Sequence, residues 1–325
     1  KVLKMEISEL YDMIIEAFNM PISYLTNSKK RIYYVYLITS AILAYYVYYK
    51  SKSKRTFFNY LLPKKIWLSR SAFVDYLMVF FNSFIKILVI GPYLIFGLYI
   101  AYYTNEYLLA IFGYPTVSLG KAQTIILYTI ALTIIGDFAS YLMHYLMHKI
   151  PFLWEFHKVH HSARKLTPMT QYRIHPIELI INNVKEILIF GVLTGIFDYL
   201  SDNQVHKIMF IGVNIFGFLF MFLGANLRHS HVKLTYPIFL EKIIISPFQH
   251  QIHHSENPEH YNKNLGSKFA FWDLMFGTLV ISKKVTNLKF GLGNENDDYD
   301  TFIKNLFAPF KRIINSIKFY FTNFG

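Results

Sequence analysis

The chain of 325 residues contains no cysteine. Disulfide frameworks, thiolate zinc sites, iron–sulfur clusters and cysteine nucleophiles are therefore excluded, and any metal must be held by nitrogen and oxygen ligands. The HExxH motif of zinc metalloproteases is also absent, as is the repeated Glu-x-x-His of carboxylate di-iron bundles. No glycine-rich dinucleotide motif follows a predicted strand, so electrons for redox chemistry are expected to come from elsewhere.

Charged residues are scarce as well, at 16% of the chain, whereas hydrophobic residues make up 54% and aromatic residues 18%. This composition predicts an integral membrane protein. The formal net charge of +13 would suit a nucleic-acid partner, but the basic residues lie in loops beside apolar runs. That pattern is typical of membrane topology and of contact with anionic lipid, so nucleic-acid binding is not expected.

Several apolar runs are long enough to cross a membrane. Gly91 and Pro92 interrupt the second of them, which is therefore either one kinked helix or a re-entrant hairpin. The last two runs lead the chain away from one face of the membrane and back to the same face, either as two spans or as a re-entrant hairpin. We expect an all-α fold with about four transmembrane helices, drawn from residues 32–49, 73–103, 122–147, 177–200 and 208–227.

The distribution of basic residues predicts the orientation of these spans. The loop 50–70 is strongly basic, whereas the stretch 104–120 has no lysine or arginine. By the positive-inside rule the first is cytoplasmic and the second external. Span 122–147 then delivers His144 and His148 at the cytoplasmic end, in a bacterial inner membrane or the endoplasmic reticulum.

The histidines are clustered. His144 and His148 lie four residues apart, and an HxxHH pattern occurs twice, in FHKVHHS and in FQHQIHHS. Residues three and four apart share a helical face, so each cluster presents convergent imidazoles. The membrane path puts eleven histidines on one face: His144, His148, His157, His160, His161, His175, His229, His231, His250, His253 and His254.

So many imidazoles exceed what one metal accepts, and the sequence therefore predicts two metal ions. All-nitrogen ligation suits iron, zinc or copper better than calcium or magnesium. His206 and His260 are expected to stand apart from this site.

Three polar side chains are expected to support the histidines. Asp137 and Tyr141 precede His144 by seven and three residues, so they share its helical face and could orient an imidazole through its other ring nitrogen. Glu178 could do the same from the next helix. An equal alternative for Asp137 is a hydrogen bond to a neighbouring element. Asn264, Trp272 and Asp273 are expected to form a structural turn that closes the fold over the site.

Together these motifs resemble the fatty acid hydroxylase superfamily of integral membrane di-iron enzymes, in its sterol desaturase branch. The resemblance covers roughly residues 130–280. It rests on DFASYLMHYLMH, FHKVHHS, YRIHPIE and SPFQHQIHHSENPEHYNKNLGSKFAFWDLMFGTLV.

The resemblance implies two iron ions on the cytoplasmic side and dioxygen as co-substrate, with zinc as a substitute in purified protein. The implied reaction hydroxylates or desaturates an unactivated C–H bond of a lipid such as a sterol or fatty acyl chain. The electron donor would be external, of cytochrome b5 type, ferredoxin type, or a pterin. The implied ligands are His144, His148, His157, His160, His161, His229, His250, His253 and His254, with undecided roles for His175 and His231.

One membrane domain, 32–284, is the simplest organisation. An amphipathic segment, 1–31, precedes it and is too charged for a signal peptide. The tail 285–325 is expected to contain a basic interfacial helix. Two other functions compete: a metal transporter, which would need ligands near mid-bilayer, and a non-catalytic lipid-binding relative, which would lack several ligands.

Overall fold

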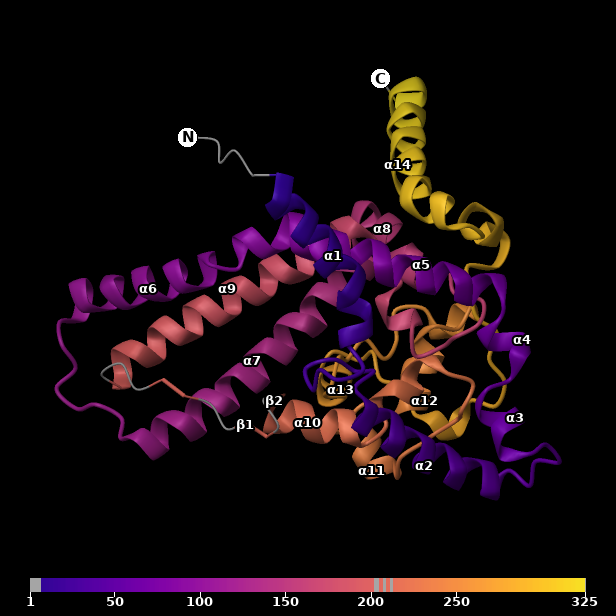
Figure 1. The fold of residues 1–325 in the computed structure, drawn as a ribbon, viewed down its shortest axis with the longest axis horizontal. Helices are drawn as coiled ribbons and strands as arrows, with labels where there is room; N and C mark the ends of the chain where they lie inside the picture. The colour runs from indigo at the N-terminus through magenta and orange to yellow at the C-terminus, as the bar shows by residue number, and fades with distance from the viewer. Residues whose placement is uncertain (1–6, 202–204, 207–208, 211–212, 325) are drawn as a thin grey trace.

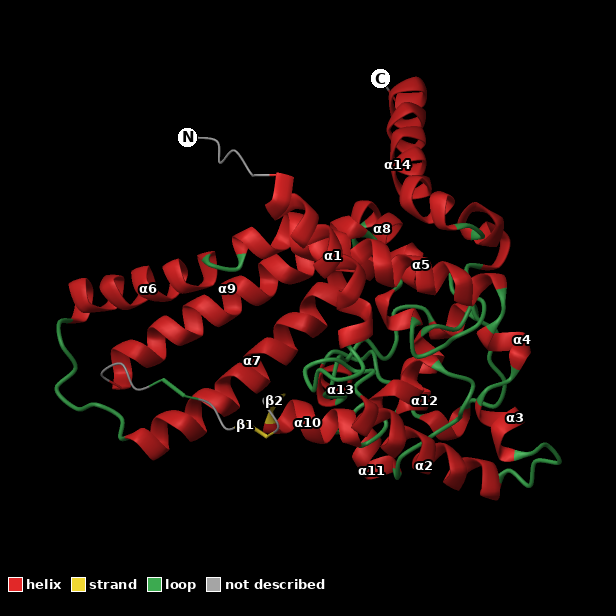
Figure 2. Cartoon of the chain, in the orientation of Figure 1, coloured by secondary structure: helices red, strands yellow, loops and turns green. Residues whose placement is uncertain are grey.

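The computed structural model describes residues 7–201, 205–206, 209–210 and 213–324. Helices dominate it (Figures 1 and 2). The only strands in the described part of the chain, β1 (Met209–Phe210) and β2 (Val213–Asn214), pair in a short antiparallel ladder. The predicted all-α fold is therefore confirmed.

Three helical segments are long and apolar enough to cross a membrane: Arg70–Phe112, Lys121–Lys149 and Pro176–Ser201. The second is α7 and the third is α9. On the left of Figure 1, α9 lies between α7 and α6 (Phe96–Phe112), the distal part of the first segment. The short helices that carry many of the histidines, among them α8 (Pro151–His161) and α12 (Pro247–His253), lie to the right of these long helices in Figure 1. We call this region, together with the adjoining end of α7, the cap.

The first segment is one kinked helix, which decides between the two predicted alternatives. α5 (Arg70–Phe84) continues through a π-helical turn at Ile85–Ile90 and a 3₁₀ turn at Gly91–Tyr93 into α6. Pro92 has no N–H to donate, and its ring displaces the carbonyl one turn earlier, so the hydrogen-bond ladder widens there. Its 43 residues extend beyond the predicted 73–103, and at ~1.5 Å per residue they exceed a hydrocarbon core of ~30 Å.

Two predicted spans are shorter than expected. α2 (Tyr34–Lys50) has 17 residues, about 26 Å, less than the ~30 Å of a hydrocarbon core. Among the described residues of the return segment 208–227, the one α-helix is α10 (Ile215–Phe222), which Asn214 caps and which the left-handed Gly224 ends. The expected count of about four spans thus becomes three within the described residues. The return to the starting end is nevertheless right, because His229 contacts His160.

Glycines let α6 and α9 pack closely. A Cβ at Gly191 would lie 2.7 Å from Cβ of Ile100, and one at Gly195 would lie 2.6 Å from Cβ of Thr104 and closer still to the Ala101 carbonyl oxygen. These two glycines, four residues apart, place the backbones of the two helices in contact, as small residues do between membrane helices.

Replacement of Gly195 by alanine is expected to destabilise the helix pair by about 1–3 kcal/mol, because the new methyl group must displace backbone. Gly136→Ala on α7 is the matched control, since nothing lies within 4 Å of its added Cβ. Thermal unfolding in detergent should show a clear loss for the first variant only. Equal midpoints for the two variants would contradict the close packing.

The cap consists of short helices joined by loops (Figure 2). α8 starts at Pro151 because Ile150, which precedes a proline, is extended and ends α7. The helices of the cap and its surroundings are α3 (Phe57–Leu61), α4 (Lys64–Trp67), α8 (Pro151–His161), α11 (Ile238–Glu241), α12 (Pro247–His253) and α13 (Phe271–Met275), with 3₁₀ turns at Thr170–Tyr172, Ala225–His229, Pro258–His260, Ser282–Lys284 and Gly293–Tyr299.

The two terminal helices lie against the body at one end. α1 (Ile7–Ser23) packs against α5, with Ala17 buried and the Phe18 ring 5.0 Å from the Phe84 ring. α14 (Phe302–Phe324) contacts α8 and then extends away from the cap (Figure 1). Its apolar residues Ile303, Phe307 and Ile314 are exposed, as expected for an interfacial helix.

Candidate metal centre

All nine histidines of the implied ligand set lie together inside the cap. α7 carries two of them, α8 carries three, the 3₁₀ turn Ala225–His229 carries one, and α12 with its C-cap residue carries three. The extended Ile150 turns the chain sharply, so α8 folds back beside the end of α7. As a result the His148 and His157 rings lie 4.9 Å apart.

The nine rings form two groups. In each group, one ligand nitrogen per ring lies within 4.8 Å of every other. The five-histidine group contains His144, His148, His157, His161 and His253. The four-histidine group contains His160, His229, His250 and His254.

In each HxxHH pattern, the first and last histidines belong to one group and the middle histidine belongs to the other. In α8, His157 and His161 serve the five-histidine group and His160 the other. In α12 and its C-cap, His250 and His254 belong to the four-histidine group and His253 belongs to the five-histidine group. At 3.6 residues per turn, adjacent residues point about 100° apart, so the last two histidines of each pattern face different ways.

The nitrogens of the four-histidine group have no consistent pairing among themselves. Nε2 of His229 lies 3.1 Å from Nε2 of His250, 3.1 Å from Nε2 of His254 and 3.3 Å from Nε2 of His160. Neutral rings cannot satisfy so many mutual contacts with one ring hydrogen each. Nitrogens bonded at ~2.0–2.1 Å to one tetrahedral metal lie roughly 3.3 Å apart, so this group fits a cation at its centre.

The five-histidine group shows the same deficit. Nε2 of His144 lies 3.1 Å from Nε2 of His157, and the buried Nε2 atoms of His148, His161 and His253 have no hydrogen-bond partner. Buried nitrogens without a partner are unfavourable unless a ligand satisfies them. The residues of both groups therefore fit metal ions.

Burial also keeps these rings in the form that binds metals. Desolvation, with neighbouring histidines as the next cause, lowers the pKa of His161, His253 and His254 well below the usual range, and does the same for His160. For His229 and His250 the pKa is likewise well below the usual range, with burial as the largest cause. Neutral imidazoles offer the lone pair that a metal requires.

Outer contacts fix the orientation of four rings. Nδ1 of His144 donates to the Leu265 carbonyl oxygen at 2.8 Å, and Nδ1 of His253 to the Lys263 carbonyl oxygen at 2.9 Å. Nδ1 of His160 lies 3.3 Å from the Arg173 carbonyl oxygen. Each contact assigns the hydrogen to Nδ1 and leaves Nε2 free to face the group.

Glu178 orients the fourth ring, as the sequence predicts. Its Oε1 lies 3.0 Å from Nδ1 of His157, and both side chains are buried. Because Glu178 is in the first turn of α9, this contact also joins α9 to α8.

The prediction that Asp137 and Tyr141 orient an imidazole directly is wrong. The Asp137 carboxylate accepts the N–H groups of Lys268 and Phe269 and the indole N–H of Trp272, which corresponds to the alternative role. The Tyr141 hydroxyl pairs with that of Thr278. Seven residues separate Asp137 from His144, about 10 Å along the helix, which is out of reach of the same ring.

The predicted turn over the site is present. Asp273 accepts the N–H groups of Leu265 and Gly266 at 2.7 and 2.8 Å, and Asn264 joins the Gln249 carbonyl to the Val280 N–H. The turn holds the Leu265 carbonyl in place for His144. Asp137 binds the residues that follow this turn, Lys268 and Phe269.

The remaining histidines lie outside both groups. Nε2 of His175 donates to the Leu306 carbonyl oxygen at 3.1 Å while its Nδ1 accepts the Ile177 N–H, so both its nitrogens are used. Nε2 of His231 donates to the Tyr60 carbonyl oxygen. As expected, His206 and His260 are also separate, the first exposed and the second buried in its own turn.

Sequence reasoning missed two arginines. Nη2 of Arg228 lies 2.8 Å from Nδ1 of His250, Arg228 donates to the Ser267 carbonyl at 2.6 Å, and its burial lowers its pKa to about 9. Arg173 is buried and donates to groups on several elements. The sequence did hold a signal for both arginines, because Arg228 directly precedes His229 in RHSH and Arg173 lies two residues before His175 in YRIHP.

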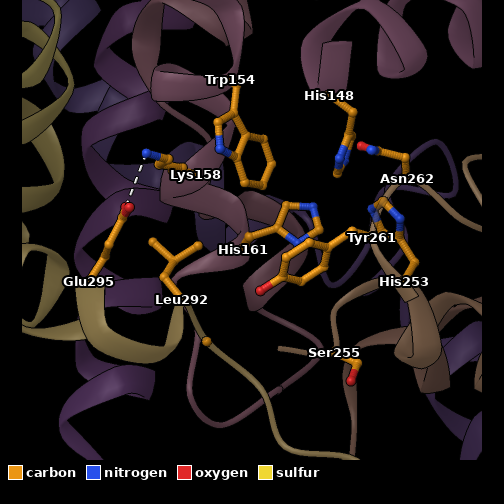
Figure 3. A pocket seen from close by; sticks show the side chains of 11 residues that line it. His148, Trp154, Lys158, His161, His253, Ser255, Tyr261, Asn262, Leu292 and Glu295 are labelled. Carbon is orange, nitrogen blue, oxygen red and sulfur yellow. Dashed lines mark ion pairs between the residues drawn. The ribbon is translucent and has the colours of Figure 1, made fainter. Parts of the chain in front are cut away.

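Two cavities reach the histidines from different sides. The smaller, about 290 Å³, is lined by His148, His161 and His253 together with Trp154 and Tyr261 (Figure 3). The larger, about 430 Å³, is lined by histidines of both groups: His144, His157, His160, His229 and His250. The larger cavity is therefore the one from which a single bound molecule can approach both groups.

Comparisons with known proteins agree with this geometry. The fatty acid hydroxylase family model matches residues 129–278, close to the roughly 130–280 expected from the motifs. The chain is 28% identical to an alkylglycerol monooxygenase of Caenorhabditis elegans over 161 residues, which are 49% of this chain and 28% of that protein. It is 28% identical to the ornithine lipid hydroxylase OlsE of Rhizobium tropici over 181 residues, which are 55% of this chain and 49% of that protein.

A further relative is an alkylglycerol monooxygenase of Xenopus tropicalis, 25% identical over 53% of this chain and 34% of that protein. The chain thus aligns with about half or less of the length of these relatives. No solved structure matches it significantly. None of the three names refers to a sterol, so the sterol desaturase branch remains a prediction. The matched region contains every histidine of both groups, and the comparisons support a relationship to the fatty acid hydroxylase superfamily.

Proposed function

We propose that this protein is a membrane-bound, dioxygen-dependent lipid hydroxylase whose two histidine groups each hold one iron ion. The observation that supports this most is the pair of buried groups, linked through α8 and α12 and lining one cavity. The family match and the relatives named as lipid hydroxylase and monooxygenases support the same reaction class.

The ligand chemistry and the reaction class argue against zinc, and the resemblance to di-iron enzymes favours iron over copper. Imidazole nitrogens suit iron, zinc and copper, and oxygen chemistry requires a metal that changes its oxidation state. When bound, the irons would supply the reduction of dioxygen. In the net reaction, one oxygen atom enters a C–H bond and the other leaves as water, with two electrons and two protons from an external donor.

The residues of this chain orient and shield that chemistry. Glu178 and the carbonyls of Leu265, Lys263 and Arg173 fix the rings. The cap buries every ring of the four-histidine group, so bulk water is kept away from the reacting carbon. Desaturation would need the same electrons and protons and would yield two waters. We propose hydroxylation because one relative is named a hydroxylase and the other a monooxygenase.

The position of the groups argues against a metal transporter. A transporter would hold ligands near mid-bilayer, whereas His144 and His148 lie within the last six residues of α7 and the other ligands lie in the short helices and turns beyond it. The basic loop 50–70 lies at the cap end in Figure 1, and the loop 113–120 lies at the opposite end. This charge distribution supports a cytoplasmic cap.

The test uses the full chain, purified in detergent and loaded anaerobically with ferrous iron. Total lipid extract, a chemical reductant and ¹⁸O-labelled dioxygen are added, and lipids are analysed by mass spectrometry. We expect about two irons per chain and a lipid that gains one ¹⁸O atom, with no product for zinc-loaded protein. Protein with two irons that oxidises no lipid, or products without the label, would overturn the proposal.

A further inference from the structure

We propose that the larger cavity binds the phosphate-type anionic head group of a lipid, and that the oxidised carbon therefore lies close to that head group. This inference rests on the proposed hydroxylase function for its second part only. The anion site itself is argued from the charges that line the cavity.

Cations from four separate elements line this cavity. Lys29, Lys30 and Arg31 come from the loop between α1 and α2, Lys86 comes from the π-helical turn, and Lys185 comes from α9. Arg228, which already donates to the Ser267 carbonyl, comes from the 3₁₀ turn Ala225–His229. The carboxylates among the lining residues are Glu178, which contacts His157, and Glu186, which pairs with Lys185 at 3.1 Å.

Apart from Arg228, four of these cations have no anionic partner among the described residues. Within the described residues, Lys29, Lys30, Arg31 and Lys86 form no ion pair. Lys30, Arg31 and Lys86 are nevertheless partly buried. Burial is the largest cause that lowers the pKa of Lys30 and of Arg31. Partly buried like charges repel one another and lose hydration, and a multivalent oxyanion between them would relieve both effects.

The cations are held in place rather than free in solvent. Lys86 donates to the Tyr24 hydroxyl at 3.1 Å and lies over the Tyr24 ring, 5.4 Å from its centre, while Lys30 lies 4.9 Å from the same centre. The loop that carries Arg31 is fixed because its carbonyl accepts the Asn226 amide at 2.6 Å. Such preorganisation is typical of a binding site rather than of a solvated basic loop.

The smaller cavity provides an internal comparison. Its one lysine, Lys158, is neutralised by Glu155 at 2.8 Å and by Glu295 at 3.0 Å, the second pair being visible in Figure 3. Excess positive charge is therefore a property of the larger cavity, not of every route to the histidines. That cavity has the volume of ordinary ligand sites.

The second part of the inference follows from the shared cavity. The same space of about 430 Å³ is bounded by the cations and by five of the grouped histidines, with Met147, Ile174 and Met221 as apolar lining. A phosphate at the cations leaves only the first carbons of the lipid within reach of the histidines. Oxidation is therefore expected near the head group and not deep in an acyl chain.

The test first measures binding to the iron-loaded full chain in detergent. The probes are dioctanoyl phosphatidic acid, dioctanoylglycerol, which lacks the phosphate, and inorganic phosphate. We expect phosphatidic acid to bind at least tenfold more tightly than dioctanoylglycerol. Lys30→Gln with Lys86→Gln should remove this preference, whereas Lys283→Gln with Lys284→Gln, on an exposed turn, should not. Iron content serves as the folding control for both variants.

The outcomes separate the two proposals. Equal affinity for the two lipids, or a preference that survives in the Lys30 and Lys86 variant, would overturn the head-group site. Binding of inorganic phosphate without binding of phosphatidic acid would assign the site to free phosphate and would also overturn it. Selective binding without lipid oxidation would remove the hydroxylase proposal and leave the anion site. Label found far along an acyl chain would overturn the second part alone.

Discussion

Replacing His254 by alanine is expected to reduce the metal content from about two ions per chain to about one and to lower lipid oxidation by at least ~100-fold. His254 belongs to the four-histidine group, so only three imidazoles would remain there. His161→Ala is its counterpart, because His161 holds the same last position in the other HxxHH pattern. It removes one of five imidazoles and leaves four.

The two variants are therefore expected to differ in metal retention but not in loss of turnover. His254→Ala should lose the ion of the four-histidine group during purification. His161→Ala should keep most of the ion of the five-histidine group but release it to a chelator faster than the wild type does. Metal analysis by mass spectrometry and chelator competition give the two readouts. His206→Ala, at an exposed position outside both groups, is the control. Two tightly held ions in both histidine variants would refute the assignment of the groups.

The grouping of the histidines shows what the sequence can and cannot predict. The three-and-four spacing of His157, His160 and His161 predicts convergent imidazoles because it depends only on helix geometry. The division into five and four depends on how α8 and α12 face each other. Carbonyls and side chains from distant loops set that orientation, such as Lys263 for His253 and Glu178 for His157. No local pattern contains this information.

The membrane spans show the same limit in another form. The run 208–227 is apolar, yet α10, the one α-helix among its described residues, has Asn214 as its N-cap and ends before Gly224. The N-cap residue Asn214 and the left-handed Gly224 set the length of this helix, and hydrophobicity averaged along the sequence detects neither of them. The return of the chain to its starting face was predictable, because two consecutive apolar runs lead away from one face and back to it whether they are two spans or a re-entrant hairpin.

Arg173→Met is expected to have the largest effect on stability, about 3–5 kcal/mol, because it leaves a buried carboxylate without its cation. The Arg173 guanidinium lies 3.3 Å from the Asp75 carboxylate, and the two side chains are 1% and 0% exposed. It also donates to the Val159 and Tyr299 carbonyls and to the Ser162 hydroxyl. One side chain thus joins α5, α8 and the segment before α14.

A double variant separates the lost ion pair from the lost hydrogen bonds. Asp75→Asn with Arg173→Met removes both charges, so part of the stability should return relative to Arg173→Met alone, and thermal unfolding in detergent measures the difference. Because the Arg173 carbonyl orients His160, both variants should also release the metal of the four-histidine group faster than the wild type. A single variant that unfolds at the wild-type temperature would show that Arg173 does not hold the cap together. If the metal is lost without a change in unfolding temperature, Arg173 instead acts mainly through His160.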